Sequence, residues 1–125
     1  MPVTLVRLTE RYTACRLPPD AAPPQWARGE FVSITRTPSE LSVFAPTACV
    51  PQGVRAESGW RLLAVKGPLA FEIVGLLAEL SSQLAAANIS IFAISTFDTD
   101  YIATRDDDFE RALETLAAAG HTVDP

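Results

Sequence analysis

The spacing of apolar residues predicts regular structure most clearly in the second half of the chain. From residue 71 onward, apolar side chains recur at steps of three and four, which predicts a helix that begins at Phe71. Its apolar face consists of Ile73, Leu77, Leu80, Leu84 and Ala87. Asn88 tolerates the left-handed conformation typical of a helix C-terminus, so we expect the helix to end there.

Strands are predicted on both sides of this helix, and a second helix follows them. Residues 61–66 form an apolar stretch that the turn pair Gly67-Pro68 closes. Residues 89–96 are rich in β-branched and aromatic side chains, apolar on both faces, which indicates a strand in the centre of its sheet. Residues 100–104 form the next strand.

The second helix is predicted to begin at the acidic run Asp106-Asp107-Asp108, where carboxylates meet the positive end of the helix dipole. Asp107 and Glu110 fit a capping box, and Gly120 ends the helix. The residues expected to be buried are Phe109, Ala112, Leu113 and Leu116. Residues 121–123 leave room for one short strand.

The order strand, helix, strand, strand, helix, strand from residue 60 onward predicts an α+β fold of the ferredoxin-like type. It consists of one antiparallel sheet with two helices on one face. The first half reads as strands at residues 3–7, 12–17, 31–36 and 41–45, with a helical turn at 25–28 and proline-rich connections. We therefore expect a β-rich unit over residues 1–59 and a βαββαβ unit over residues 60–125.

Composition and charge narrow the classes of partner. The chain has 125 residues, of which 48% are hydrophobic and 20% charged, enough for a sizeable core. Residues 1–60 carry six Arg and five acidic residues, whereas residues 61–125 carry four basic and ten acidic residues. Without a basic stripe, nucleic acids and anionic membranes are poor partners. Cys15 and Cys49 lack metal-ligand spacing, and there is no signal peptide or long apolar run, so we expect reduced thiols in a cytoplasmic protein.

Evidence for catalysis is thin. His121 is the only histidine, and its position after Gly120 suggests a surface residue at a turn. The chain contains no nucleophile elbow, phosphate loop or dinucleotide fingerprint. The acidic run at 106–108 could hold a metal, but a helix start explains it better. An enzyme would need Lys66, Asp98 and Asp100 to converge, so we expect no catalytic residue, no metal and no cofactor.

Two loops fall at the same edge of the predicted sheet and could bind a small zwitterion. The connection at 67–70 leads into a helix start that presents the free amide groups of Phe71 to Val74, which suit a carboxylate. The connection at 96–100 offers Asp98, Asp100 and the aromatic Phe97, which suit an ammonium group. The alternative is an ordinary hairpin turn in which Asp98 caps backbone amides.

The residues from Gly67 to Val123 resemble the C-terminal part of small bacterial ACT-domain proteins. The most specific stretch reads SIFAISTFDTDYI, and upstream the stretch SITRTPSELSVFAP (Ser33 to Pro46), Val50-Pro51 and Gly59-Trp60 also resemble that group. The group is similar to the paired ACT modules of aspartate kinase and to the arginine-sensing regulator of animal cells. One departure is Ala103-Thr104, where relatives keep larger apolar residues.

The resemblance implies two ACT-like units in one chain, the first with a degenerate or missing helix, and a side-by-side homodimer. It implies a non-catalytic regulatory module that binds an amino acid at the junction of the units; the alternative is a dimerisation or docking scaffold without ligand. The two acidic side chains favour a basic or small neutral amino acid. By position, the ligand-binding residues would be Gly67, Pro68, Phe71, Glu72, Ile73, Val74, Thr96, Phe97, Asp98 and Asp100, with Ser42 and Val43 closing the pocket.

Overall fold

The structure, a computed structural model, describes residues 1–69 and 74–124 and divides the chain into two units. The helical unit combines Met1–Thr9 with Arg61–Pro125, and the β unit is Glu10–Trp60. The predicted first unit, residues 1–59, therefore differs from the β unit at its start, because the first nine residues belong to the helical unit. They belong with the second half of the chain because their strand pairs with two strands of the helical unit.

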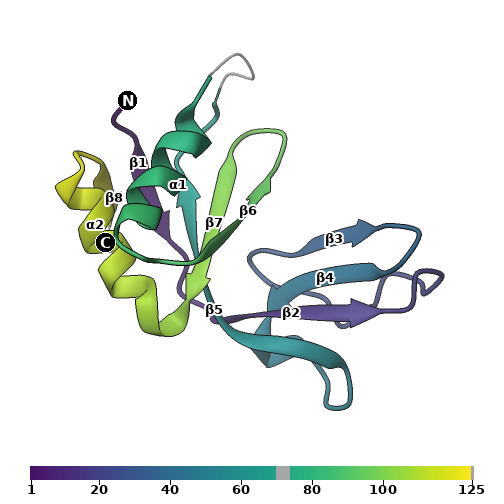
Figure 1. The fold of residues 1–125 in the computed structure, drawn as a ribbon. Coiled ribbons are helices and arrows are strands. Elements are labelled where there is room, and N and C mark those ends of the chain that lie inside the picture. The colour runs from purple at the N-terminus through teal and green to yellow at the C-terminus, as the bar shows by residue number, and fades with distance from the viewer. Residues whose placement is uncertain (70–73, 125) are drawn as a thin grey trace. The chain divides into compact units, whose positions relative to one another are not determined.

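The sheet of the helical unit is mixed (Figure 1). Its strands are β1 (Thr4–Arg7), β5 (Arg55–Val65), β6 (Ile91–Ser95), β7 (Asp100–Arg105) and β8 (Thr122–Asp124), in the order β8-β1-β5-β7-β6. Strand β1 is antiparallel to β5 and parallel to β8. The prediction of a purely antiparallel sheet was wrong, because the distant N-terminal strand inserts between the first and last strands of the βαββαβ unit.

Strand β6 is at an edge of this sheet rather than in its centre. Among the described strands it pairs with β7 alone, from Ile91 opposite Thr104 to Ser95 opposite Asp100. Its apolar residues are half-buried or exposed. The prediction of a central strand was wrong because an apolar pattern on both faces reports side-chain character, whereas the number of neighbouring strands is set by the connections.

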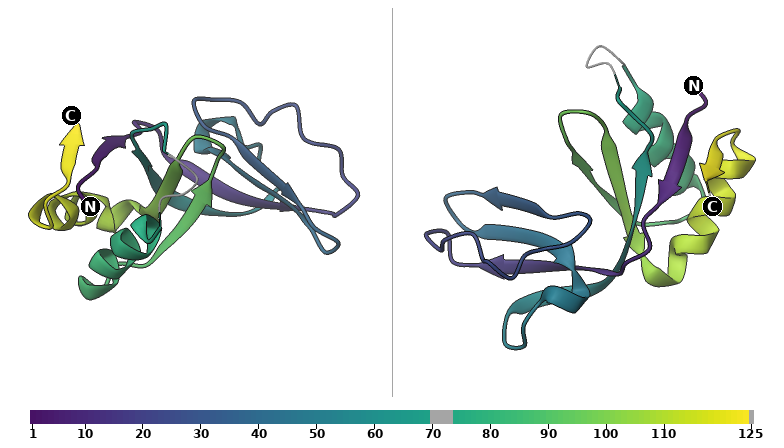
Figure 2. Two further views of the ribbon diagram at one scale, coloured as in Figure 1. Left: turned by 90° about the horizontal axis from the view of Figure 1, so that it is seen from above. Right: turned by 180° about the vertical axis from the view of Figure 1, so that it is seen from behind.

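The two helices, α1 (Leu76–Ala86) and α2 (Phe109–Ala118), cover one face of the sheet (Figure 2). Their apolar residues share one buried cluster with strand residues, which consists of Leu5, Leu63, Val65, Leu76, Leu80, Leu84, Ile89, Ile102, Phe109, Ala112, Leu113 and Leu116. The four residues predicted to be buried on α2 are all buried. Amphipathic spacing of three and four residues therefore identified this layer correctly.

Both helices end in the same hydrogen-bonded motif. After α1, Asn88 has φ 60°, its amide donates to Ala85 O at 2.9 Å, and the Ile89 amide donates to Leu84 O at 3.0 Å. After α2, Gly120 has φ 104°, and the His121 amide donates to Leu116 O at 3.1 Å. These are Schellman motifs, which satisfy the last carbonyls of a helix. Both predicted helix ends are confirmed.

The start of α1 differs from the prediction. The helix begins at Leu76, and Gly75 precedes it with φ 85°, a left-handed conformation that favours glycine. Val74 therefore lies outside the helix and is 86% exposed. Phe71, Glu72 and Ile73 lie outside the described residues. The periodic pattern extended the helix too far because it cannot detect a backbone reversal at a glycine.

The start of α2 also lacks the predicted capping box. A short 3₁₀ helix, η2 (Asp106–Asp108), leads into α2, and no side chain caps it through a hydrogen bond. Two of the three carboxylates pair with arginines instead: Asp106 lies 3.6 Å from Arg61, and Asp108 lies 3.0 Å from Arg111. The acidic run therefore lies at the helix start, as predicted, but its carboxylates form ion pairs with arginines and do not cap the helix.

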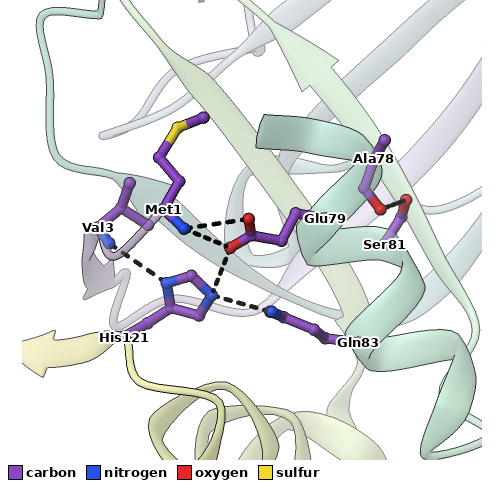
Figure 3. Close-up of polar contacts among 7 residues, drawn as sticks. All are labelled: Met1, Val3, Ala78, Glu79, Ser81, Gln83 and His121. Carbon is purple, nitrogen blue, oxygen red and sulfur yellow. Dashed lines mark hydrogen bonds and ion pairs between the residues drawn. The ribbon is translucent and has the colours of Figure 1, made fainter. Parts of the chain in front are cut away.

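His121 is buried, not a surface residue at a turn, with 5% of its area exposed. Its Nδ1 accepts the Val3 amide at 3.2 Å, so Nε2 carries the proton and donates to Gln83 Oε1 at 2.8 Å (Figure 3). Nε2 also lies 3.5 Å from Glu79 Oε2, which accepts a hydrogen bond from the N-terminal amine of Met1. His121 therefore connects α1 to the segment just before β1. The position of His121 in the sequence did not indicate that its side chain is buried.

The β unit is an antiparallel sheet in the order β3-β4-β2-β5. Its strands are β2 (Tyr12–Leu17), β3 (Ser33–Arg36), β4 (Leu41–Pro46) and the first part of β5, and a short 3₁₀ helix, η1 (Thr47–Cys49), follows β4. Within residues 10–60, all of which are described, there is no α-helix. The predicted helical turn at 25–28 is only a turn, with Ala27 N donating to Pro24 O at 3.3 Å.

One side of the β unit carries a small apolar core of Cys15, Leu41, Val43 and Ala45. Elsewhere in the unit Tyr12 stacks on Phe44 with ring centroids 5.4 Å apart, and Phe31 meets both rings edge-on. Cys15 and Cys49 are free, as predicted, and burial together with Cys49 raises the pKa of the Cys15 thiol. In the described part of the chain, neither helix is long and apolar enough to cross a membrane.

Candidate functional site

The β6–β7 hairpin closes with a tightly bonded turn at residues 96–99. The Thr96 amide donates to Thr99 O at 2.8 Å, and the Thr99 amide donates back to Thr96 Oγ1 at 3.3 Å. These bonds fix the backbone of the turn and leave the side chains of Phe97 and Asp98 at its tip. Phe97 is 81% exposed, an unusual position for a large aromatic residue.

The connection from β5 toward α1 is bonded to this turn. The Leu69 amide donates to Asp98 O at 2.7 Å, and Thr99 Oγ1 donates to Val65 O at 2.5 Å. At Gly67 the two backbones come so close that a Cβ atom would lie 3.0 Å from Asp98 O and 3.1 Å from Thr99 Cβ. The peptide bond between Gly67 and Pro68 is cis. The close approach at position 67 therefore leaves no room for a side chain beside the turn.

Replacing Gly67 with alanine tests this close approach. The added methyl group must displace the backbone at Asp98, so we expect the Gly67→Ala variant to lose about 1–3 kcal/mol of unfolding free energy. Urea unfolding followed by circular dichroism measures the loss. Unchanged stability, together with an unchanged Asp98 amide resonance in NMR spectra, would show that the turn does not depend on this contact.

The N-terminus of α1 points free amide groups at the same region. The first helical bond runs from Glu79 N to Gly75 O at 2.8 Å, so the amides of Leu76, Leu77 and Ala78 have no acceptor within the helix. No side chain among the described residues caps them. Together with the helix dipole, such amides favour an anionic group.

The turn and the helix start line one cavity of about 350 Å³. One wall is apolar, with Leu69, Leu76 and Leu77, and the other is polar, with Ser95, Thr96, Asp98, Thr99 and Asp100; Gly75, Ala78 and Phe97 complete the lining. The two loops that the sequence suggested as binding elements therefore face the same space. Every lining residue belongs to the helical unit.

The two carboxylates of the cavity lack a counter-charge. Asp98 is exposed, and Asp100 is half-buried and accepts a hydrogen bond from Ser95 Oγ at 2.5 Å. Neither forms an ion pair with a residue in the described part of the chain; Lys66, which precedes Gly67, lies 3.9 Å from Asp124 instead. The cavity therefore presents amide donors on one side and two uncompensated negative charges on the other.

The predicted site residues divide into three groups. Thr96, Phe97, Asp98 and Asp100 line the cavity. Gly67 and Pro68 belong to the connection beside it, and Val74 precedes the helix start. Ser42 and Val43 lie in β4 of the β unit, where Val43 is 0% exposed in the core of that unit, and their predicted role stays a prediction.

Several lining residues were not among the predicted ligand-binding residues, namely Leu69, Gly75, Leu76, Leu77, Ala78, Ser95 and Thr99. Most of them surround the true start of α1, which was predicted five residues too early. The signal that could have located it is Gly75, since a glycine directly before an apolar helix is a known N-cap residue. Thr99 and Leu69 lie within the two connections that were predicted to bind, whereas Ser95 directly precedes the second of them.

A family model described as ACT domain matches residues 55–118, which is more than half of the chain. The chain is an ACT-domain protein. A second family model, which describes an N-terminal domain, matches residues 10–53. The ACT match covers β5 through α2 and so includes the whole cavity lining.

Solved structures and curated relatives agree with this assignment. A crystal structure of a protein from Agobacterium tumefaciens is 40% identical, with a TM-score of 0.91, and the match covers 98% of this chain and 92% of that one. Aspartate kinase from Synechocystis shares the fold, with a TM-score of 0.71 and 18% identity over 99% of this chain and 28% of the kinase. The human cytosolic arginine sensor for mTORC1 subunit 1 is 38% identical over 58 residues, which is 46% of this chain but only 18% of the sensor.

Proposed function

We propose that this ACT-domain protein is a non-catalytic regulatory module that binds a free amino acid in the cavity between the start of α1 and the β6–β7 turn. The observation that carries the proposal is the convergence of unbonded helix amides with two unpaired aspartates on one cavity. In an α-amino acid the carboxylate and the ammonium group are about 2.5 Å apart by bond lengths, so one molecule can reach both walls.

Each charged group of the ligand has a partner of opposite polarity. The carboxylate would accept the amides of Leu76 to Ala78 at the positive end of the helix dipole. The ammonium group would donate to Asp100 or Asp98, whose charges no described residue neutralises. The side chain of the amino acid would then lie along Leu69, Leu76 and Leu77.

The relatives support the class of ligand. The mammalian relative that aligns with this chain over 58 residues is named as an arginine sensor, and an aspartate kinase from Clostridium acetobutylicum that shares the fold is described as an allosteric enzyme. Because the aligned stretch is a small part of the sensor, its ligand is not transferred to this chain. The two aspartates favour a basic or small neutral amino acid over an acidic one.

Calorimetric titration of the full chain with each of the twenty amino acids tests the proposal. An amino acid has about ten non-hydrogen atoms, which limits its affinity to roughly the micromolar to millimolar range. We expect saturable heat from one or a few of them, and a stabilisation of about 2.7 kcal/mol at a hundredfold excess over Kd. The absence of heat with all twenty at millimolar concentration would contradict the proposal.

A second candidate function is an interaction scaffold that docks on another protein with its cavity empty. Val74 and Phe97 favour it, since both are large apolar side chains beside the cavity with more than four-fifths of their area exposed. A thermal-shift survey separates the two functions. An amino acid that raises the melting temperature supports the sensor, whereas no shift combined with weaker partner capture by the Phe97→Ala variant supports the scaffold.

A further inference from the structure

The β unit contains a second cavity, of about 280 Å³, that the proposed function does not use. Its walls come from three neighbouring strands, β4, β2 and β5 (Figure 1), and consist of Ala14, Cys15, Arg16, Glu40, Ser42, Arg55, Ala56 and Glu57. Two arginines and two glutamates in so small a space distinguish it from an ordinary strand surface.

A β-bulge brings the two arginines together. Tyr12 pairs with Trp60, but after the bulge Ala14 pairs with Glu57 and Arg16 with Arg55. Had the first register continued, Arg16 would face Ala56 and Arg55 would point to the opposite face of the sheet. Gly59, with φ 89°, supplies the left-handed residue that such a bulge uses.

This pairing places two positive charges opposite each other on exposed residues. Directly opposed residues of an antiparallel pair have Cβ atoms about 5 Å apart, and like charges at that distance repel. Arg16 is anchored by a hydrogen bond from its guanidinium group to Ser39 O at 2.8 Å. Neither arginine forms an ion pair with any residue in the described ranges 1–69 and 74–124. Guanidinium groups on two directly opposed residues can hold a carboxylate or phosphate between them through paired N–H donors.

The glutamates restrict which anion fits. Glu57 lies two residues from Arg55 and therefore on the same face of β5, and Glu40 lines the same cavity beside Ser42. A simple anion would gain from the arginines and be repelled by these carboxylates. A molecule with both an anionic and a cationic group gains from the arginines and also from Glu57, which is opposite Ala14, two residues from Arg16 on the same face of β2.

We propose that this cavity binds a small zwitterion whose carboxylate or phosphate is held between Arg16 and Arg55 and whose amine faces Glu57. The site is independent of the cavity beside α1, since the two share no lining residue. Under this proposal the register shift at Gly59 has a function, because it places Arg55 directly opposite Arg16.

NMR titration of the full chain tests the proposal with three probes: O-phosphoethanolamine, β-alanine and inorganic phosphate. We expect the amide resonances of Ala14, Arg16, Ser42 and Arg55 to shift and to saturate with at least one zwitterion, at a ligand concentration below about 10 mM. Inorganic phosphate alone should bind more weakly. The preferred zwitterion shows whether the anionic group is a phosphate or a carboxylate. No saturable shift with either zwitterion, or tighter binding of inorganic phosphate than of both, would overturn the proposal.

Two variants complete the test. Arg55→Gln should weaken the zwitterion at least tenfold and, without ligand, raise the melting temperature, because the repulsion with Arg16 is gone. Arg28→Gln is the matched control, since among the described residues the Arg28 side chain bonds to Gln25 O of its own turn and does not line the cavity. Equal affinity in Arg55→Gln and Arg28→Gln would overturn the proposal. Asp100→Asn, which affects the other cavity, should leave this binding unchanged, so the two sites can fail separately.

Discussion

Replacing Phe109 with alanine is expected to lower the free energy of unfolding by about 3–5 kcal/mol. Phe109 is 0% exposed in the shared core of the helical unit, and the Arg61 guanidinium group lies 4.1 Å from the centre of its ring. The substitution removes apolar contacts, leaves a cavity and deprives Arg61 of its cation–π partner. Urea unfolding followed by circular dichroism measures the effect.

Phe97→Ala is the matched control for this measurement. The same atoms are deleted, but Phe97 is 81% exposed at the tip of the β6–β7 turn, so stability should change by no more than about 0.5 kcal/mol. Similar losses in both variants would contradict the assignment of Phe109 to the core and of Phe97 to the surface.

The second large effect is expected at the cavity beside α1. Asp100→Asn should weaken the best amino-acid ligand found by calorimetry by tenfold or more, because the ammonium group loses its counter-charge. The asparagine side chain can still accept the hydrogen bond from Ser95 Oγ, so the fold of the hairpin should be kept. The affinity is measured by the same titration, and the melting temperature should stay close to that of the parent chain.

Asp107→Asn serves as its control, since it removes the same charge from an exposed residue of η2 that does not line the cavity. Its effect on affinity should be less than twofold, because solvent and salt screen distant surface charges. Equal weakening in both variants would mean that only the net negative charge of the chain matters, and the ammonium site would have to be abandoned.

Features that depend on a few consecutive residues were predictable. The buried face of α2 follows from apolar residues at steps of three and four, and its end follows from Gly120. Asn88 similarly marks the end of α1. The start of α1 was not found, because the reversal at Gly75 interrupts no hydrophobic pattern, and the glycine itself was the one local signal for it.

The candidate site was predictable in part for the same reason. The acidic and aromatic residues of the β6–β7 turn are adjacent in sequence, so their shared location follows from the hairpin itself. That Leu69 bonds to Asp98, and that α1 opens toward the turn, depends on packing between segments about thirty residues apart.

The sequence by itself determined the type of most elements, the two helix ends and the acidic character of the turn, since local spacing and single-residue conformational preferences decide these properties. Only the tertiary structure decided that β1 lies between β5 and β8, that His121 is buried against α1, and that a bulge places Arg55 opposite Arg16. These features arise from pairing and packing between distant segments, for which the free energy depends on the whole fold rather than on any local pattern.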